Sequence, residues 1–441
     1  MKSDVKSRAK KAREASWQLA NVPEEAKNKA LKAMADAVVK RRAEILSANK
    51  KDLDAAQTLV KQGKLSKALY DRLKLSESKI GAIAEGIRSV ARLPDPTGKT
   101  LSCTELDAGL TLYKVTVPIG VLGIVFESRP DAVPQIASLA LKSGNAVLMK
   151  GGREADESNK TLAKILVEAA ASVAEIPDGW LQVLTSREEV AQLLALDELV
   201  DLMIPRGSNQ FVKHIMENTK IPVLGHAAGR CHMYVDAKAD LKMAENLCVD
   251  AKCQYPAVCN ATETILVHKD VAKKFIPTLV KALSENEVEI KGSTQVQKIG
   301  GKKVKPATEE DYYTEYNDLK VNIKTVPSLT EAIAHINKYG SHHTDAIITD
   351  DKKAASTFLN QTDSASVMHN ASTRFADGYR YGLGAEIGIS TNKIHARGPV
   401  GLEGLIIYKW ILKGSGQKVA DYVGEKARKY VHRPLNRAWK P

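Results

Sequence analysis

The sequence predicts an α/β protein made of two units, each a parallel sheet covered by helices. The chain has 441 residues, 44% of them hydrophobic, which suffices for two or three domains with cores of their own. Short apolar runs alternate with longer segments of helical periodicity over residues 120–224 and again over 231–348. This alternation is typical of parallel sheets, which bind ligands at the carboxyl ends of their strands.

The first unit begins with helices. Apolar residues such as Leu31, Met34 and Val38 recur at helical spacing, so residues 3–50 are predicted to form a helical cover that continues to about Val90. Alternation over residues 110–117 predicts an extended strand between two larger units. Buried strands are then expected at 121–126, 146–149, 181–184, 199–204 and 222–224, with helices at 131–141, 157–173 and after Ser186 and Ser208.

The second unit repeats the alternation. Strands are expected at 231–235, 263–267, 319–326 and 346–348, with helices from Leu241, Val271 and Leu329. The segment 291–308 is rich in Gly and Lys, which predicts an exposed loop. A basic helical tail is expected after Gly416.

The charge balance favours anionic partners. Lys and Arg number 65 and Asp and Glu 52, giving a formal net charge of +13. The basic residues are spread along the chain, aromatic residues make up only 5%, and no nucleic-acid-binding pattern is recognisable. A phosphorylated metabolite or cofactor would suit the same charge, although a basic solvated surface explains most of it.

No membrane segment or metal site is predicted. The apolar candidate at 115–126 is too short to cross a bilayer, and the N-terminal segment lacks the apolar core of a signal peptide, so a cytoplasmic location is the default. The five cysteines include no Cys-x-x-Cys pair and are expected to be reduced. The spacing of Cys248, Cys253 and Cys259 does not suit zinc, and His335, His342 and His343 are expected at the surface or lining a pocket.

Cys259 is the first candidate for chemistry. It follows Pro256 and precedes the apolar run 265–267, so it is expected on a short loop at a strand entrance. Such a loop can present a reactive thiol, although the segment alone favours an inert buried one.

Two further segments suit a phosphate. Lys150-Gly151-Gly152-Arg153 ends a predicted strand, where glycines admit a ligand to the backbone and two cations attract it; an exposed turn is the alternative. Gly207 and Ser208 lie where a strand ends and a helix begins, so their amides can hold a phosphate and Ser208 can equally serve as a helix N-cap.

These segments resemble the aldehyde dehydrogenase superfamily, in the branch that reduces an acyl phosphate. The similar stretches are 117–121, 127–130, 150–152, the cysteine segment 254–264 and 332–345, so the resemblance covers nearly the whole chain up to Gly416. It implies an aldehyde dehydrogenase-like α/β fold with a Rossmann-like NADP(H)-binding domain at 1–99 and 118–228, an α/β catalytic domain at 229–404, a small β oligomerisation arm at 100–117 and 405–416, and a basic C-terminal tail at 417–441.

The resemblance implies that Cys259 is a nucleophile. The expected reaction is NADPH-dependent reduction of L-glutamyl 5-phosphate to L-glutamate 5-semialdehyde and phosphate through a cysteine thioester, the second step of proline biosynthesis. The backbone amide of Cys259 or Asn260 would stabilise the oxyanion, together with Ser128 where relatives carry an asparagine. His226 stands where aldehyde oxidisers carry the glutamate that activates water, which suits a thioester meant for hydride.

The resemblance also implies a cofactor site and a substrate site. Arg153 replaces a glutamate of NAD-using relatives and would favour a 2′-phosphate, so NADP(H) is the expected cofactor. Lys150 would bind the adenosine ribose and Glu315 the nicotinamide ribose. Arg374, with Ser372 and Thr373, would bind the substrate's amino-acid end, Arg374 through the α-carboxylate.

The expected partners follow from the same resemblance. The chain would form a homo-oligomer, a dimer or a tetramer, through the strands at 110–117 and 406–412. The glutamate 5-kinase that supplies the unstable acyl phosphate is a candidate partner.

Two other functions are compatible with parts of the sequence. A general aldehyde dehydrogenase would share the fold, but His226 in place of a carboxylate opposes it. A basic nucleic-acid-binding or scaffold protein without catalysis would not need Cys259.

Overall fold

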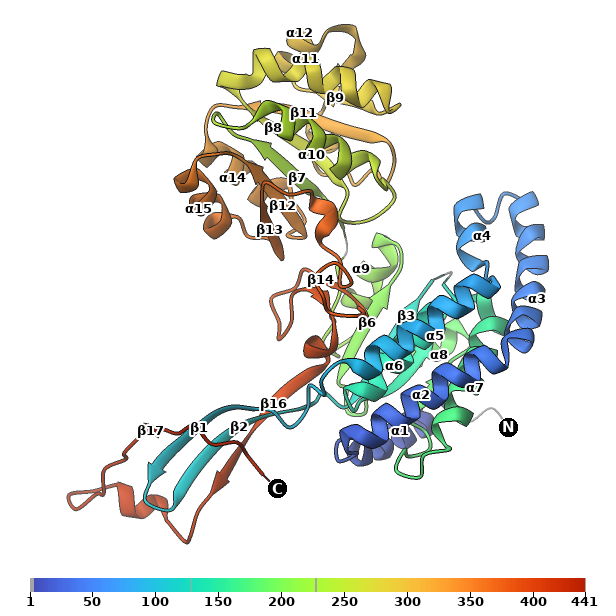
Figure 1. Cartoon of the computed structure of the whole chain (residues 1–441), viewed down its shortest axis with the longest axis vertical. Helices are drawn as coiled ribbons and strands as arrows, with labels where there is room; N and C mark the ends of the chain where they lie inside the picture. The colour runs from blue at the N-terminus through green and yellow to red at the C-terminus, as the bar shows by residue number, and fades with distance from the viewer. Residues whose placement is uncertain (1–3, 128, 227, 441) are drawn as a thin grey trace.

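The computed structural model describes residues 4–127, 129–226 and 228–440 and has three parts (Figure 1). One part contains helices α1 to α9 around a small sheet, a second contains a larger sheet with its own helices, and a long β arm extends from the first part on the side away from the second. The site candidates of the sequence fall on the first two parts.

The first unit is built on a four-stranded parallel sheet with the order β5-β4-β3-β6. Every residue of β3 and β4 is buried, because helices cover the sheet. The chain passes from β3 to β4 and β5 on one side and returns to β6 on the other. The carboxyl ends of β3 and β6 therefore flank the switch point, where such sheets bind ligands. The strands are β3 (Val121–Phe126), β4 (Ala146–Lys150), β5 (Leu181–Val183) and β6 (Leu202–Arg206).

The helical cover predicted for the first unit is confirmed. Helix α2 shows why it forms, because Leu31, Met34 and Val38 lie on one stripe and are fully buried. The predicted strand at 222–224 is wrong: Val223 makes only an isolated parallel bridge to Met203. The helices are α1 (Val5–Leu19), α2 (Glu24–Lys40), α3 (Arg42–Lys61), α4 (Lys67–Leu73), α5 (Glu77–Arg92), α6 (Ala132–Lys142), α7 (Asp156–Ala170), α8 (Arg187–Leu194) and α9 (Asn209–Glu217), with the 3-10 turn η1 (Arg153–Ala155).

The second unit is built on a seven-stranded parallel sheet with the order β10-β9-β11-β8-β7-β12-β13. Its strands are β7 (Cys231–Val235), β8 (Thr262–His268), β9 (Glu289–Gly292), β10 (Val304–Pro306), β11 (Lys320–Val326), β12 (Thr344–Ile348) and β13 (Ser366–His369). Its helices are α10 (Leu241–Cys253), α11 (Lys269–Glu285), α12 (Thr294–Gly300), α13 (Glu309–Tyr312), α14 (Leu329–Tyr339) and α15 (Lys352–Gln361), with η2 (Gly301–Lys303) and η3 (Thr373–Phe375).

The exposed loop predicted at 291–308 is wrong. This segment contains the end of β9, helix α12 and the edge strand β10. Val296 and Val304 anchor it by packing into the core of the second unit. Because Gly and Lys dominate the segment, the two buried valines do not form a recognisable apolar pattern.

The arm is a four-stranded antiparallel sheet with the order β16-β2-β1-β17. Its strands are β1 (Thr100–Asp107), β2 (Leu110–Pro118), β16 (Ile406–Lys413) and β17 (Arg433–Pro434). A two-stranded sheet, β14 (Gly388–Ser390) and β15 (Gly398–Val400), and the turn η4 (Leu402–Leu405) precede β16. The alternating strand expected at 110–117 is β2, and its partner β1 was not predicted.

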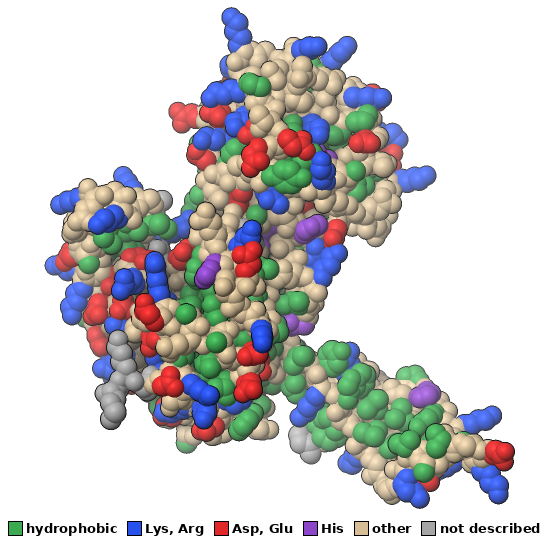
Figure 2. Space-filling model, turned by 180° about the vertical axis from the view of Figure 1, so that it is seen from behind, with side chains coloured by type: hydrophobic (Ala, Val, Ile, Leu, Met, Phe, Trp, Pro, Cys, Tyr) green, Lys and Arg blue, Asp and Glu red, His purple; other side chains and the backbone are tan. Residues whose placement is uncertain are grey.

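The predicted helical tail is wrong. After the 3-10 turn η5 (Val419–Tyr422), the tail runs back along the arm and pairs with β1 through β17. Leu435 and Trp439 pack on the face of the arm that holds Tyr113 and Ile411. The opposite face bears the exposed side chains of Tyr408, Trp410 and Leu412, and Figure 2 shows apolar side chains gathered along the arm.

Two further properties follow from the fold. Within the described ranges, no helix is long and apolar enough to cross a membrane. The five cysteines, Cys103, Cys231, Cys248, Cys253 and Cys259, are all free of disulfide bonds, as the sequence predicted.

Candidate active site

Cys259 lies on the loop between α10 and β8, where the chain enters the strand, as the sequence predicted. Cys231 opens β7, and His343 directly precedes β12. Strand β7 pairs with β8 on one side and with β12 on the other, so three adjacent parallel strands gather these residues at the amino edge of the sheet. The sheet itself positions the thiol.

A close backbone contact fixes the loop that carries Cys259. A Cβ atom on Gly229 would lie 2.2 Å from the carbonyl oxygen of Cys259 and 2.4 Å from its Cα atom, so only glycine fits there. The thiol of Cys231 donates a hydrogen bond to the same carbonyl oxygen at 3.2 Å. Gly229 and Cys231 therefore hold the backbone of Cys259 in place through a close contact and a hydrogen bond to its carbonyl oxygen.

Two histidines stand beside the Cys259 thiol. The Nδ1 atom of His226 lies 3.0 Å from the carbonyl oxygen of Ile389, and burial lowers the pKa of His226, so its ring is neutral near pH 7. His343 is buried, and its ring meets that of His226 edge to face at 5.1 Å between centroids. One ligand-type atom from each of His226, His343 and Cys259 lies within 4.8 Å of the others.

The three histidines considered from the sequence separate in the structure. His343 lines the site, which agrees with a pocket position. His335 is buried elsewhere, with its ring 4.3 Å from that of Tyr339, and His342 bonds the carbonyl oxygen of Asp363 through Nδ1 at 2.6 Å. Because β12 lies beside β7, His343 approaches the thiol, and this neighbourhood is a property of strand order that sequence spacing does not reveal.

The proposed oxyanion donors differ in what the structure describes of them. Asn260 is buried, and its Nδ2 atom donates to the carbonyl oxygen of Ala376 at 2.9 Å, which holds this loop against the segment after η3. Ser128 lies outside the described residues. The oxyanion roles of Ser128 and of the amides of Cys259 or Asn260 stay predictions.

Two arginines lie within electrostatic reach of Cys259. Arg206, the last residue of β6, bonds Oε1 of Gln135 at 3.2 Å. Burial and the like charge of Arg129 lower the pKa of Arg206 to about 10, so it stays charged at neutral pH. A Cys259 thiolate would favour the charged forms of both Arg206 and Arg374. Sequence reasoning singled out Arg374 but not Arg206, which belongs to the first unit and is distant from Cys259 in the chain.

The predicted substrate residues lie on η3. Arg374 is buried, which lowers its pKa, and its Nε atom bonds Oε1 of Gln254 at 3.0 Å. Ser372 accepts a bond from the backbone amide of Arg374 at 3.3 Å, and the hydroxyls of Thr373 and Thr262 lie 3.2 Å apart. Ser372 and Thr373 thus hold the arginine's backbone, and their direct contact with substrate stays a prediction.

Three cations gather at the carboxyl ends of β4 and β5. Lys150 ends β4 and is buried, and burial lowers its pKa, with Arg187 and Arg153 adding like charge and Glu154 opposing them. Arg153 and Arg187 are exposed. Sequence reasoning missed Arg187, which begins α8 just after β5 and comes near Lys150 because β5 pairs with β4.

The start of α9 connects the two units. The backbone amide of Ser208 donates to Oε2 of Glu127 at 2.8 Å, and the Ser208 side chain makes no capping bond. Asn209 donates through Nδ2 to Oε2 of Glu315 at 2.6 Å. A cofactor that bound along Gly207 and Ser208 would therefore also meet Glu315, although Glu127 occupies the Ser208 amide in this arrangement.

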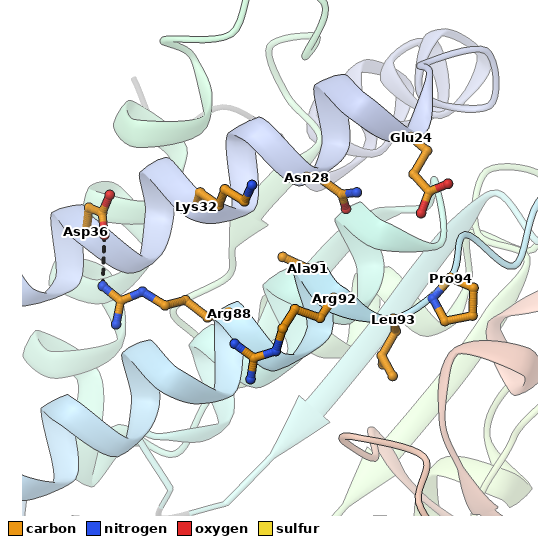
Figure 3. Close-up of a pocket in the computed structure, with 9 residues that line it drawn as sticks. All are labelled: Glu24, Asn28, Lys32, Asp36, Arg88, Ala91, Arg92, Leu93 and Pro94. Atoms are coloured by element: carbon orange, nitrogen blue, oxygen red, sulfur yellow. Dashed lines mark hydrogen bonds and ion pairs between the residues drawn. The ribbon is translucent and has the colours of Figure 1, made fainter.

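A separate groove lies between α2 and α5 (Figure 3). It is lined by side chains of both helices, and Arg88 bonds Asp36 across it at 2.8 Å. Next to it, the buried ammonium of Lys142 bonds Glu24 at 3.0 Å and Asn28 at 2.6 Å. None of the residues that line the groove is a predicted site residue.

The chain is similar to known proteins over its whole length. The sequence pattern of the Aldehyde dehydrogenase family matches residues 1–300. A protein of Methanosarcina barkeri named gamma-glutamyl phosphate reductase is 56% identical over 440 residues, which cover 99% of this chain and 98% of that protein. The protein of the same name from Natronomonas pharaonis is 54% identical over 441 residues and all of both chains.

A solved structure agrees with these relatives. The crystal structure of gamma-glutamyl phosphate reductase from Thermotoga maritima is 40% identical and has a TM-score of 0.91, covering 94% of this chain and 100% of that one. The aldehyde dehydrogenase-like α/β fold expected from the sequence is thereby confirmed. The chain belongs to the aldehyde dehydrogenase family and, within it, to the gamma-glutamyl phosphate reductases.

Proposed function

We propose that this protein reduces L-glutamyl 5-phosphate with NADPH to L-glutamate 5-semialdehyde and phosphate, the second step of proline biosynthesis from glutamate. The observation that carries the proposal is a thiol, Cys259, held at the edge of one parallel sheet, with the charged groups of Arg206 and Arg374 within electrostatic reach. The name shared by relatives 54% and 56% identical over nearly the whole chain supports the same substrate.

Cys259 acts as the nucleophile. Its thiolate attacks the acyl carbon, the bond from that carbon to the phosphate oxygen breaks, and phosphate leaves with the bonding electrons, so that a thioester remains. The nicotinamide cofactor, when bound, supplies hydride to the thioester carbon. The oxyanion, held by the amide of Cys259 or Asn260 and by Ser128, re-forms the carbonyl as the carbon–sulfur bond breaks, which frees the aldehyde and restores the thiolate.

The lowered basicity of the buried His226 beside the thiol supports reduction over hydrolysis. A general base for deacylation must take a proton from water, and burial has lowered the proton affinity of this imidazole. The thioester would then persist until hydride arrives.

The two arginines divide the charges of the substrate between them. Arg374, on η3, binds the α-carboxylate, since a guanidinium matches a carboxylate with two parallel bonds. Arg206, at the end of β6, attracts the phosphate and stabilises it as it departs. Both sites are positive, which agrees with a substrate that carries an anion at each end.

The cations at the ends of β4 and β5 favour NADPH over NADH. A 2′-phosphate adds about two negative charges to the adenosine ribose, and Lys150, Arg153 and Arg187 are grouped to receive them. A Cβ atom on Gly151 would lie 2.1 Å from Nδ2 of Asn159, so no side chain fits at this position. The backbone of the turn therefore stays open to a ligand beside the cations.

We also infer that the protein forms a homodimer or a dimer of dimers through the arm. Tyr408, Trp410 and Leu412 form an exposed apolar stripe on one face, and β16 lies at the edge of its sheet. An apolar face next to an open strand edge is a surface that a second copy can cover.

The test is the reverse reaction on purified protein. Oxidation of glutamate 5-semialdehyde should require inorganic phosphate, should proceed with NADP⁺ far better than with NAD⁺, and should vanish in Cys259→Ser. Oxidation that is equally fast without phosphate would instead indicate a hydrolytic aldehyde dehydrogenase. Full activity of Cys259→Ser would remove the nucleophile from the mechanism.

A further inference from the structure

Cys259, His226 and His343 form a cluster with the composition of a metal site. One ligand-type atom of each lies within 4.8 Å of the other two. The three residues come from the segment before β7, the loop before β8 and the turn before β12, so their convergence depends on strand order. Sequence spacing predicted no metal site because no two of the ligands are near each other in the chain.

His226 is oriented as a metal ligand. Its Nδ1 atom faces the carbonyl oxygen of Ile389 at 3.0 Å, and a carbonyl can only accept a hydrogen bond. The proton of the neutral ring therefore resides on Nδ1, which leaves the lone pair on Nε2. A backbone carbonyl that fixes the tautomer in this way is a usual partner of metal-binding histidines.

His343 supplies the second, independent observation. The residue is 1% exposed, and its Nε2 atom is buried without a hydrogen-bond partner. Its Nδ1 atom is already engaged by the hydroxyl of Thr344 at 2.8 Å and lies 3.8 Å from the thiol of Cys231. An unpartnered buried imidazole nitrogen next to a thiol needs a partner, which a cation would provide.

We propose that Cys259, His226 and His343 bind a borderline-soft divalent cation, with Zn²⁺ as the best match, and that the bound cation blocks the nucleophile reversibly. Two imidazoles and a thiolate are ligands that zinc prefers, at about 2.0 Å for nitrogen and about 2.3 Å for sulfur. Tetrahedral geometry with those bonds places the ligand atoms about 3.3–3.5 Å apart, closer than the 4.8 Å limit within which they lie in the structure, so metal binding requires them to move together.

Binding has a simple chemical balance. The thiol gives up its proton to solvent as the sulfur–metal bond forms, and a water molecule fills the fourth position. No electron is transferred. Because the sulfur lone pair is then shared with the metal, the thiol can neither attack an acyl phosphate nor react with an alkylating reagent. The charges of Arg206 and Arg374 oppose a cation there, which keeps the site reversible.

The test uses the purified metal-free full chain without substrate or cofactor. Equilibrium dialysis should find one Zn²⁺ bound per chain, and Co²⁺ should give a thiolate-to-cobalt charge-transfer band that disappears in Cys259→Ser. Zn²⁺ should also slow the alkylation of Cys259 by iodoacetamide, located by peptide mass spectrometry. A chelator should restore the original rate.

Matched variants separate this site from unspecific binding. His343→Gln should weaken Zn²⁺ binding by more than about tenfold, since loss of even a supporting group costs that much at metal sites. His342→Gln removes the neighbouring histidine, which bonds Asp363, and should leave binding unchanged. Equal affinity in His343→Gln and the parent protein, or a cobalt band that survives in Cys259→Ser, would overturn the proposal. These results are independent of the reductase activity, because no turnover is measured.

Discussion

Replacing Gly229 by alanine tests whether backbone packing positions the nucleophile. The new Cβ atom would meet the carbonyl oxygen of Cys259 at 2.2 Å, whereas such contacts essentially never fall below 3.0 Å. The two segments must separate by most of an ångström, and backbone rather than a flexible side chain has to move. A misplacement of about 1 Å costs on the order of 100-fold in rate, equivalent to about 2.7 kcal/mol of transition-state stabilisation.

The assay is the phosphate-dependent oxidation of glutamate 5-semialdehyde, with the rate of Cys259 alkylation as a second readout. Gly229→Ala should lower kcat/KM by about 100-fold and change the alkylation rate, while the free energy of unfolding falls by only about 1–3 kcal/mol. Gly225→Ala is the matched control, because its nearest neighbouring atom, on Pro205, would lie at an ordinary 3.4 Å. Activity of Gly229→Ala within about twofold of the parent protein would refute the idea that this contact sets the position of the thiol.

Four further predictions concern a buried ion pair, the cofactor site, a buried histidine and the β arm. The buried ammonium of Lys252 bonds the buried carboxylate of Glu263 at 2.8 Å, so Lys252→Met should leave that carboxylate without a partner and lower the free energy of unfolding by about 3–5 kcal/mol in urea titrations. The double variant Lys252→Met with Glu263→Leu should recover most of that loss, and no recovery would contradict the pairing. Arg153→Glu should raise the KM for NADPH far more than that for NADH, and an equal rise for both would exclude contact with the 2′-phosphate. Burial lowers the pKa of His335 to about 2, so the folded state resists protonation of this ring. The free energy of unfolding should therefore fall by up to about 1.4 kcal/mol per pH unit as pH falls below about 6.5. Urea titrations at successive pH values should show a smaller slope for His335→Phe. Trp410→Lys should shift sedimentation velocity toward a monomer with unchanged circular dichroism, and an unchanged sedimentation coefficient would show that the stripe is not the interface.

The parallel strands were predictable because burial on both faces leaves an unmistakable apolar run. Residues 121–126 and 231–235 are such runs, and both form central strands. The segment 291–308 was missed because its strands are short and lie at or next to the sheet edge, and because few of its apolar residues, chiefly Val296 and Val304, pack into the core. Local pattern is weak wherever an element is half exposed and short.

The tail shows a different limit of sequence reasoning. The tail after Gly416 contains charged residues at intervals that suit a helix, yet residues 431–435 run extended along β1. What holds them is distant in the chain: Trp439 donates its backbone amide to the hydroxyl of Thr100 at 2.7 Å, and its ring meets Tyr113 edge to face at 5.3 Å. Periodicity within the tail carries no information about these partners.

Site residues that lie in one sequence segment could be predicted together, whereas residues brought to the site from distant segments could not. The position of Cys259 on a loop at a strand entrance was visible in its own segment, but its role as a nucleophile was expected only from the resemblance to the aldehyde dehydrogenase superfamily. His343 and Arg206 were not assigned to it, since one depends on the adjacency of β7 and β12 and the other belongs to the first unit and is distant from Cys259 in the chain. Residues that share a site only through topology become visible once strand order is known.

The tail also limits how the arm can assemble. With Leu435 and Trp439 packed over Tyr113 and Ile411, one face of the sheet is already covered by the protein's own chain. Strand β17 likewise occupies the outer edge of β1, so among the described strands the free edge and the bare face both lie on the side of β16. A sheet whose uncovered face and unpaired edge strand lie together can bind one copy of itself there, but its covered face and paired edge offer no second binding surface. In the oligomer proposed above, the tail would therefore favour closed assemblies of finite size over open-ended fibres.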